Sequence, residues 1–322
     1  MRVVAKVSER YAIIALWGVM IGVYSVLKPS TFPTTGTFQV IFGSQAALVF
    51  LAMAFLCTVI VGDFVDLSVA SILGLCATIV PVLSVLHGWN VALASVFAVA
   101  MGVCAGAVNG LLVVYAGVNT IVVTLGMSTL LTGIALAIAH LSAVSGLSTS
   151  FGQLANASLL GLPVSFYYGI ALALVFAYVL AFTPLGRHMQ FVGANREVSR
   201  LAGVRVNRIR FGAFVASGTL CGIGGVVITA GLGGFDPSTS LTYLLPTVSA
   251  VFLGTAAVRP GRFNPLGALI GVYFLETGIL GLQEFGLGDW ISDVFYGAAL
   301  IIAVLLTTLL RRRLATRRVS TT

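Results

Sequence analysis

Residues 183–211 read TPLGRHMQFVGANREVSRLAGVRVNRIRF, and they form the one long polar interruption in an otherwise almost continuously apolar chain. The segment contains a single acid, Glu197, and six arginines: Arg187, Arg196, Arg200, Arg205, Arg208 and Arg210. Apolar runs flank it on both sides. The segment therefore divides the apolar chain into an earlier and a later part.

The middle of this segment has the start and stop signals of a short helix. Asn195 suits an N-cap, Glu197 suits the positive end of the helix, and Gly203 suits the position that ends it. We therefore predict a helix over 196–202, of about two turns. So short a helix is marginal in water. We expect another surface to cover its one apolar face, which consists of Val198, Leu201 and Ala202. A solvated basic loop is the simpler alternative.

The composition identifies the class of protein. Hydrophobic residues make up 59% of the 322, charged residues only 8%, and the mean hydropathy is +1.09. Soluble domains carry about 25% charged residues. The chain is therefore predicted to be an all-α, polytopic integral membrane protein, because each span must satisfy its own backbone polar groups. The net charge of +8 does not indicate nucleic acid, since no aromatic residues alternate with the basic ones.

About ten transmembrane helices are predicted, since a span needs about 20 apolar residues. Their ranges are 11–28, 45–61, 67–86, 90–115, 118–140, 164–183, 211–232, 243–258, 264–283 and 290–310. The first is read as an uncleaved span. Alternating the loops leaves only Lys28 outside and the other sixteen of the 17 Lys and Arg inside. Both termini are therefore predicted to be cytoplasmic, in a bacterial inner membrane.

The 183–211 segment resembles the cytoplasmic coupling loop of the permease subunits of ribose-type ATP-binding-cassette (ABC) sugar importers. The matching residues are Leu185-Gly186-Arg187, Gly193-x-Asn195 and Leu201-Ala202-Gly203-Val204-x-Val206-Asn207-x-Ile209. In that family a short helix here sits in a cleft of the partner ATPase. The resemblance implies a coupling loop over 184–210 whose key residues are Gly193, Asn195, Glu197, Val198, Leu201, Ala202 and Gly203.

The resemblance also implies the partners. They are an ABC ATPase subunit inside, a periplasmic substrate-binding protein outside, and a second permease copy or paralogue in a dimer. Membrane lipids surround the chain, and no nucleic acid is expected. The whole chain, 1–322, is then a single transmembrane permease domain.

The join between the second and third predicted spans, GDFVD at 62–66, contains two acids and no basic residue. It is either a tight inner turn or a break between two helices that meet within the membrane. The residues from Asp66 to Ser71, DLSVAS, resemble the family signature Asp-Leu-Ser-Val-Gly-Ser. Asp66 is either the N-cap of the third span, bonded near Ser68, or a polar group on the solute path.

The loops and small residues add local predictions. An external interfacial helix is predicted within 29–44 and a long external loop over 141–163. Glycines spaced by four indicate close helix packing; they are Gly102, Gly106 and Gly110, Gly218 and Gly222, and Gly267 and Gly271. The cysteines are predicted to be small packing residues. Residues 253–265, LGTAAVRPGRFNP, depart from the Gly-Gly-Thr-Ser-like segment usual in this family.

The sequence lacks the motifs of an ATPase, and no enzymatic activity is predicted. No Gly-x4-Gly-Lys-Ser/Thr phosphate loop is present, so ATP would be used by a separate subunit and this chain would hold no cofactor. The three histidines are scattered, and no metal site is predicted.

Polar residues within the spans are the candidates for a translocation path. Only Glu276 lies clearly inside a span, and ionisable groups at that depth are costly. Glu276 would either bond a solute hydroxyl or pair with a neighbouring helix. The other candidates are Asp66, Ser68, Asn109, Asn119, Thr120 and Thr124. Their hydroxyls and amides suit a neutral solute, but they also suit hydrogen bonds between helices.

The prediction is therefore an ABC importer permease for a small neutral solute such as a monosaccharide. The alternative is an ATP-independent secondary transporter or channel. Proton- or ion-coupled transporters commonly use relays of buried carboxylates or histidines, and this chain has few such residues in its spans. That scarcity favours the first function.

Overall fold

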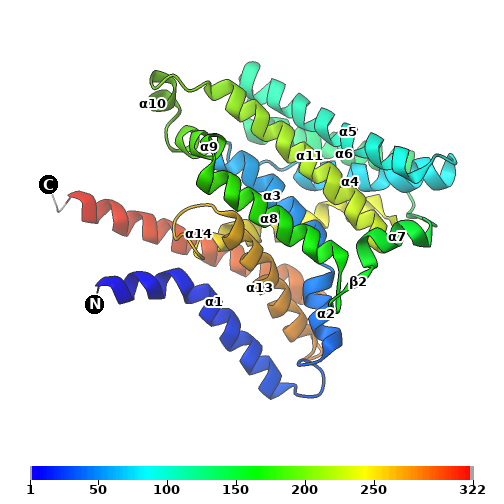
Figure 1. Ribbon diagram of the computed structural model, residues 1–322, viewed down its shortest axis with the longest axis horizontal. Helices are drawn as coiled ribbons and strands as arrows, with labels where there is room; N and C mark the ends of the chain where they lie inside the picture. The colour runs from blue at the N-terminus through cyan, green and yellow to red at the C-terminus, as the bar shows by residue number, and fades with distance from the viewer. Residues whose placement is uncertain (1, 320–322) are drawn as a thin grey trace. The chain divides into compact units, whose positions relative to one another are not determined.

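Figure 1 shows the computed structural model of the chain, which describes the backbone of residues 2–319 and the side chains of residues 13–305. The chain is mostly helical, and it divides into two compact units. Unit 2 is continuous and comprises residues 46–244. Unit 1 comprises residues 1–45 together with 245–322.

Unit 2 is a bundle of apolar helices joined by short connections. Its long helices are α3 (Ala46–Ile60), α4 (Val69–Pro81), α5 (Val91–Gly110), α6 (Thr120–Ile138), α8 (Val164–Phe182) and α11 (Val206–Leu232). Two π-helical turns extend α4 and α5, namely η1 (Val82–Leu86) and η2 (Leu111–Tyr115). Shorter helices follow α8, namely α9 (Pro184–Ala194) and α10 (Arg196–Leu201).

Helix α11 is the central element of unit 2, because it packs against α3, α4 and α5. Figure 1 shows α11 running alongside α5. A Cβ on Gly218 would collide with the backbone of Gly102 and Gly106, and a Cβ on Gly222 would meet the backbone of α5 at Val99. The predicted rows of glycines thus bring two backbones into direct contact. Helices in lipid gain from such contact, since apolar side chains there gain little over lipid itself.

Unit 1 contains five helices in its described residues. They are α1 (Arg2–Leu27), α2 (Thr35–Gly43), α12 (Leu244–Gly254), α13 (Pro265–Gln283) and α14 (Trp290–Val319), with only Leu244 assigned to unit 2. Helix α1 is bonded to α13, since the Trp17 indole donates to the Thr277 hydroxyl at 2.9 Å. Asn264 caps α13 by accepting the amide of Gly267 at 2.7 Å. Pro265 then occupies the first helical turn, where a missing N–H costs nothing.

The expected spans are confirmed only in part. Seven segments in the described chain are long and apolar enough to cross a membrane, and two shorter apolar helices cover 13–27 and 290–305. The span predicted over 243–258 is wrong in extent, because α12 ends at Gly254 after 11 residues. The chain turns after Gly254, and the Asn264 side-chain amide holds this turn by donating to the carbonyl oxygens of Gly254, Ala257 and Arg262.

The segment predicted as a long external loop, 141–163, contains short elements. Helix α7 (Thr149–Asn156) lies within it, capped by the Ser148 hydroxyl. Strand β1 (Val144–Ser145) pairs antiparallel with β4 (Gly234–Phe235), and β2 (Ser158–Leu159) pairs antiparallel with β3 (Leu162–Pro163). The 3₁₀ helix η3 (Pro237–Tyr243) follows β4. The predicted helix within 29–44 is confirmed as α2, whose N-cap is Thr34.

The cysteines fit the prediction of packing residues except at one position. Cys57, Cys76 and Cys221 are buried, whereas Cys104 is exposed on the outer side of α5. All four are free thiols.

We predict opposite effects for two glycine substitutions in unit 2. Gly218→Ala should lower thermal stability in detergent by about 1–3 kcal/mol, because the methyl group would overpack the α5–α11 contact. Gly126→Ala on α6 should leave stability unchanged or raised, since nothing lies within 4 Å of that position and alanine favours helix. Equal melting temperatures for the two variants would contradict the close packing.

Candidate functional site

Helix α10 forms as its end signals predict. The Asn195 side chain accepts the amide of Val198 at 3.1 Å, and Gly203 adopts the left-handed conformation with a φ of 81°. The helix covers Arg196–Leu201, one residue shorter than expected. The predicted N-cap and stop are therefore confirmed.

The apolar side of α10 is exposed. The exposed fraction is 48% for Val198 and 88% for Leu201, and Ala202 is exposed as well. On the opposite side Ser199 is buried, with its hydroxyl bonded to the carbonyl oxygen of Asn195 at 2.7 Å. Helix α10 thus turns apolar side chains away from the bundle, at the end of unit 2 where α11 begins (Figure 1).

Glu197 and Arg200, two largely exposed side chains of α10, form a weak ion pair. The Glu197 carboxylate and the Arg200 guanidinium are 3.4 Å apart, and both side chains are largely exposed. Exposed pairs of this kind contribute about 0–1 kcal/mol. Glu197 therefore acts on this helix mainly as an acid at its N-terminal end.

At two positions of the 183–211 segment, Gly186 and Gly193, the close approach of another backbone leaves no room for a side chain. The backbone of Gly186 lies against the carbonyl of Val179, so that α9 folds back on the end of α8. The backbone of Gly193 lies against the carbonyl of Ile60 at the end of α3. A side chain at either position would push the 183–211 segment away from the bundle.

An ion cluster fastens α10 and α11 to the turn after α3. Asp63 is 2% exposed, and its carboxylate accepts two bonds from the Arg210 guanidinium, at 2.6 and 2.8 Å. Arg196, the first residue of α10, donates to the same carboxylate at 2.9 Å and to the Gly62 carbonyl at 2.8 Å. Two bonds from one planar guanidinium to one carboxylate define the orientation of both groups. We call Asp63, Arg196 and Arg210 the anchor cluster.

The sequence did not predict the anchor cluster. Asp63 was assigned only to a turn of uncertain depth, and Arg196 and Arg210 were assigned to a basic loop. The available signal was the combination of an acid without a local basic partner and a segment of six arginines predicted on the same side of the membrane. The 62–66 join is a turn between α3 and α4, and the Arg196 side chain at the start of α10 donates to its Gly62 carbonyl.

The turn over 61–68 is strained and held by side chains. Val65 is β-branched yet has a φ of 75°, a conformation that such residues rarely adopt. Strain of this kind costs about 1–3 kcal/mol and persists where the surroundings impose it. The Thr124 hydroxyl, from α6, donates to the Val65 carbonyl at 3.4 Å and accepts the Leu67 amide at 3.1 Å.

Asp66 accepts the backbone N–H of Ser68, as predicted, although Ser68 and not Asp66 is the N-cap residue of α4. The Ser68 hydroxyl donates to the same carboxylate oxygen at 2.6 Å, and the Asn109 amide donates to the Ser68 hydroxyl at 2.8 Å. Burial raises the pKa of the Asp66 carboxyl, the bonds from Ser68 oppose that rise, and the charge of Asp63 adds to it. Among the described residues no basic side chain pairs with Asp66.

Most predicted path residues gather around this turn and bond to it or to one another. Thr124 and Asn109 are buried, and the Thr120 hydroxyl donates to Asp63 at 3.5 Å. Asn119 is exposed and caps α6 by accepting the Ile121 amide at 2.9 Å. Asn109, Thr120 and Thr124 thus hydrogen-bond α5 and α6 to the turn, which is one of the two uses that the sequence had left open. Within the described residues the buried Asn109 Oδ1 has no hydrogen-bond partner.

Glu276 belongs to unit 1 and is described separately. It lies on α13 and is partly buried. Its carboxylate makes no hydrogen bond or ion pair within the described residues. The predicted pairing with a neighbouring helix is therefore not seen there.

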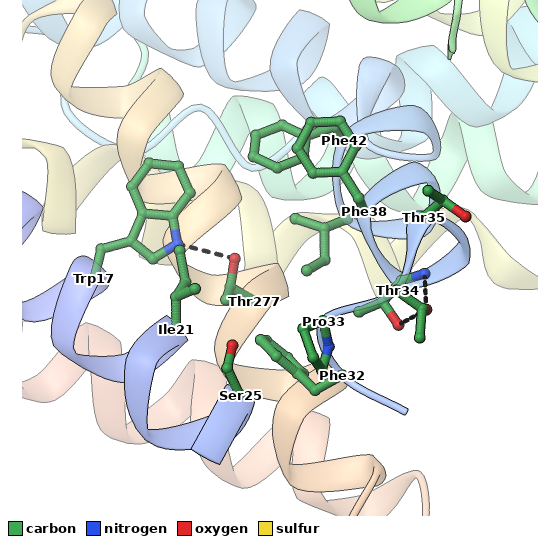
Figure 2. Close-up of a pocket in the computed structure, with 12 residues that line it drawn as sticks. Trp17, Ile21, Ser25, Phe32, Pro33, Thr34, Thr35, Phe38, Phe42 and Thr277 are labelled. Atoms are coloured by element: carbon green, nitrogen blue, oxygen red, sulfur yellow. Dashed lines mark hydrogen bonds between the residues drawn. The ribbon is translucent and has the colours of Figure 1, made fainter. Parts of the chain in front are cut away.

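Unit 1 also contains a pocket of about 530 Å³ that the sequence did not predict. Figure 2 shows Trp17, Phe38 and Phe42 around it, with the hydroxyl of Thr277 bonded to the Trp17 indole. Its lining is mainly apolar and comes from α1, α2, α13 and the α1–α2 connection. None of the candidate path residues lines this pocket.

The comparison with known families identifies the chain. The family described as "Branched-chain amino acid transport system / permease component" matches residues 37–304. That range includes both the 61–68 turn and α10. The chain belongs to this permease family. It is a transport component and not an enzyme, and it is a multi-pass protein of the bacterial inner membrane.

Relatives with curated names are permeases of import or transport systems. The permease is 32% identical to the autoinducer 2 import system permease protein LsrC of Enterobacter sp. strain 638, over 96% of this chain and 88% of that protein. It is 30% identical to LsrD of Salmonella typhi, over 76% of each chain. It is 27% identical to the D-allose transport system permease protein AlsC of Escherichia coli K12, over 94% and 93%. No solved structure matches the permease.

Proposed function

We propose that this chain is the membrane subunit of an ABC importer that carries a monosaccharide or a similarly small, neutral, hydroxylated solute. The observation that carries the proposal is the exposed apolar face of α10, held at one end of the bundle by the anchor cluster. The names of the relatives, which refer to autoinducer 2 and D-allose import, support the solute class.

In this function α10 is the coupling helix. Val198, Leu201 and Ala202 enter a cleft of a separate ATPase subunit, which binds and hydrolyses the ATP. Asn195 and Gly203 define the ends of the helix, Glu197 stabilises its first turn, and Gly193 lets it approach α3. The permease itself needs no cofactor.

The path for the solute uses the polar residues of the spans. Asn109, Thr120 and Thr124, with Asp66 and Ser68, surround the tight turn at the coupling-loop end of unit 2, and Asn119 lies beside them at the start of α6. Asn109 Oδ1 has acceptor capacity that no described residue uses. An ATP-independent transporter would leave the exposed face of α10 without a role.

The permease crosses the membrane ten times as one domain over 1–322, with both termini in the cytoplasm. Support comes from a helix at each predicted span and from the uneven distribution of basic residues. The count depends on α12, whose 11 residues extend about 16 Å, roughly half of the hydrocarbon core. Two permease chains, the ATPase and a periplasmic binding protein complete the importer.

Reporter fusions test the orientation. A reporter inserted after Gln190 or fused after Arg313 should score as cytoplasmic, and one inserted after Ser148 should score as periplasmic. The reason is that sixteen of the 17 basic residues fall on one predicted side. A periplasmic score at Gln190 would contradict the ten-span topology.

Uptake assays test the function itself. Cells that express the permease with its ATPase and binding protein should take up radiolabelled D-allose or D-ribose. This uptake should survive a protonophore while ATP is maintained, because hydrolysis supplies the energy. The purified permease alone should hydrolyse no ATP. Uptake that follows the proton gradient in cells without the ATPase would instead favour a secondary transporter.

Leu201→Asp tests the docking face. The substitution should not destabilise the permease, because Leu201 is exposed, but it would bury an unpaired charge against the ATPase at a cost of several kcal/mol. Co-purification of the ATPase and sugar uptake should both fall at an unchanged membrane level. Arg208→Gln is the control, since Arg208 is exposed in the same region and should change little. Normal ATPase binding by Leu201→Asp would show that α10 is not the coupling helix.

A further inference from the structure

The anchor cluster joins α10, α11 and the turn between α3 and α4 through the single carboxylate of Asp63. Arg196 begins the exposed helix α10 and its side chain is 38% exposed, whereas the Arg210 side chain on α11 is 12% exposed. Both guanidinium groups bond to Asp63 Oδ1, and Arg210 also bonds to Oδ2. Asp63 is therefore paired with a buried arginine of α11 and with a partly exposed arginine of α10.

Asp63 is also connected to the polar residues deeper in unit 2. Its own turn holds Asp66 and Ser68; the Ser68 hydroxyl donates to Asp66 and accepts the side-chain amide of Asn109 on α5. The Thr120 and Thr124 hydroxyls on α6 bond to the same turn. A displacement of Arg196 would act on Asp63 and, through the turn, on α5 and α6.

A buried ion cluster is a poor device for stability alone. Removing the charges of Asp63 and Arg210 from water costs several kcal/mol per ion, which their attraction only partly repays. Such a cluster is better explained by the way it fixes the positions of α10, α11 and the turn relative to one another. Bidentate bonding by Arg210 orients the carboxylate, and the second bond of Arg196 to the Gly62 carbonyl aligns α10 with the turn.

We propose that Asp63 is the positioning residue that transmits motion of the coupling helix to the α3–α4 turn and so to the polar residues of α5 and α6. This inference rests on the proposed function, in which α10 is moved by the ATPase. Asp63 touches neither solute nor ATPase in this proposal. It makes α10 and the turn move as one piece.

The test measures coupling and not only activity. The complete importer, with Asp63→Asn in the permease, is reconstituted in proteoliposomes with ATP and labelled D-allose or D-ribose. Asparagine keeps the shape but loses the charge that both arginines require. We expect the ATPase to remain bound, since the Leu201 face is untouched, and ATP hydrolysis to continue. The number of sugar molecules transported per ATP should fall at least tenfold.

Arg196→Gln provides a second measurement if Asp63→Asn does not fold. It leaves the buried Asp63–Arg210 pair intact and removes only the link to α10, so the protein should retain its thermal stability while transport per ATP falls. Arg208→Gln, which removes an exposed charge in the same region, is the matched control and should keep wild-type coupling.

Two results would overturn the proposal. One is a normal ratio of transport to hydrolysis in Arg196→Gln or in a folded Asp63→Asn variant. The other is a parallel loss of ATPase binding, hydrolysis and transport, which would mean that the cluster only supports the structure. Failure of the proposed function is seen separately, because the wild-type importer would then show no ATP-driven sugar uptake.

Discussion

The carboxylate of Asp63 connects three separate parts of unit 2. It pairs with Arg196 at the start of α10 and with Arg210 near the start of α11, and it belongs to the turn between α3 and α4. The charges of Asp63 and Arg210 are buried, so each is stable in that environment only while the other remains, whereas Arg196 is partly exposed. This contact therefore holds the start of α10 against the strained turn that carries Val65.

Glycine contacts make that geometry possible. Gly193 lets the coupling loop touch the end of α3, and Gly186 lets α9 fold back on α8. Deeper in the bundle, Gly218 and Gly222 bring α11 onto the backbone of α5. Arg210 lies in the first turns of α11, so the position of the anchor cluster depends on how closely α11 packs against α5. The glycines within the bundle thus help to determine where the charged residues at its end meet.

Much of the candidate site was predictable because its signals are local. Asn195 and Gly203 define α10 through bonds and dihedral angles within a few residues, so their types alone were sufficient. The glycine rows were predictable for the same reason. The path residues were less so, because a buried Asn109 or Thr124 can serve a solute or a neighbouring helix, and only its partners distinguish the two. The extent of α12 depended on the bonds of Asn264, ten residues beyond the helix end.

By itself, the sequence determined that the chain is a helical membrane protein, approximately where its helices lie, and that a short helix with one apolar face begins at Arg196. Composition and local patterning are sufficient for these, since every span must satisfy its own backbone in lipid. Only the tertiary structure decided that Asp63 binds Arg196 and Arg210, more than 130 residues away. A single acid among many arginines has no local preference among them, and the packing of α11 against α3, α4 and α5 selects which two it meets.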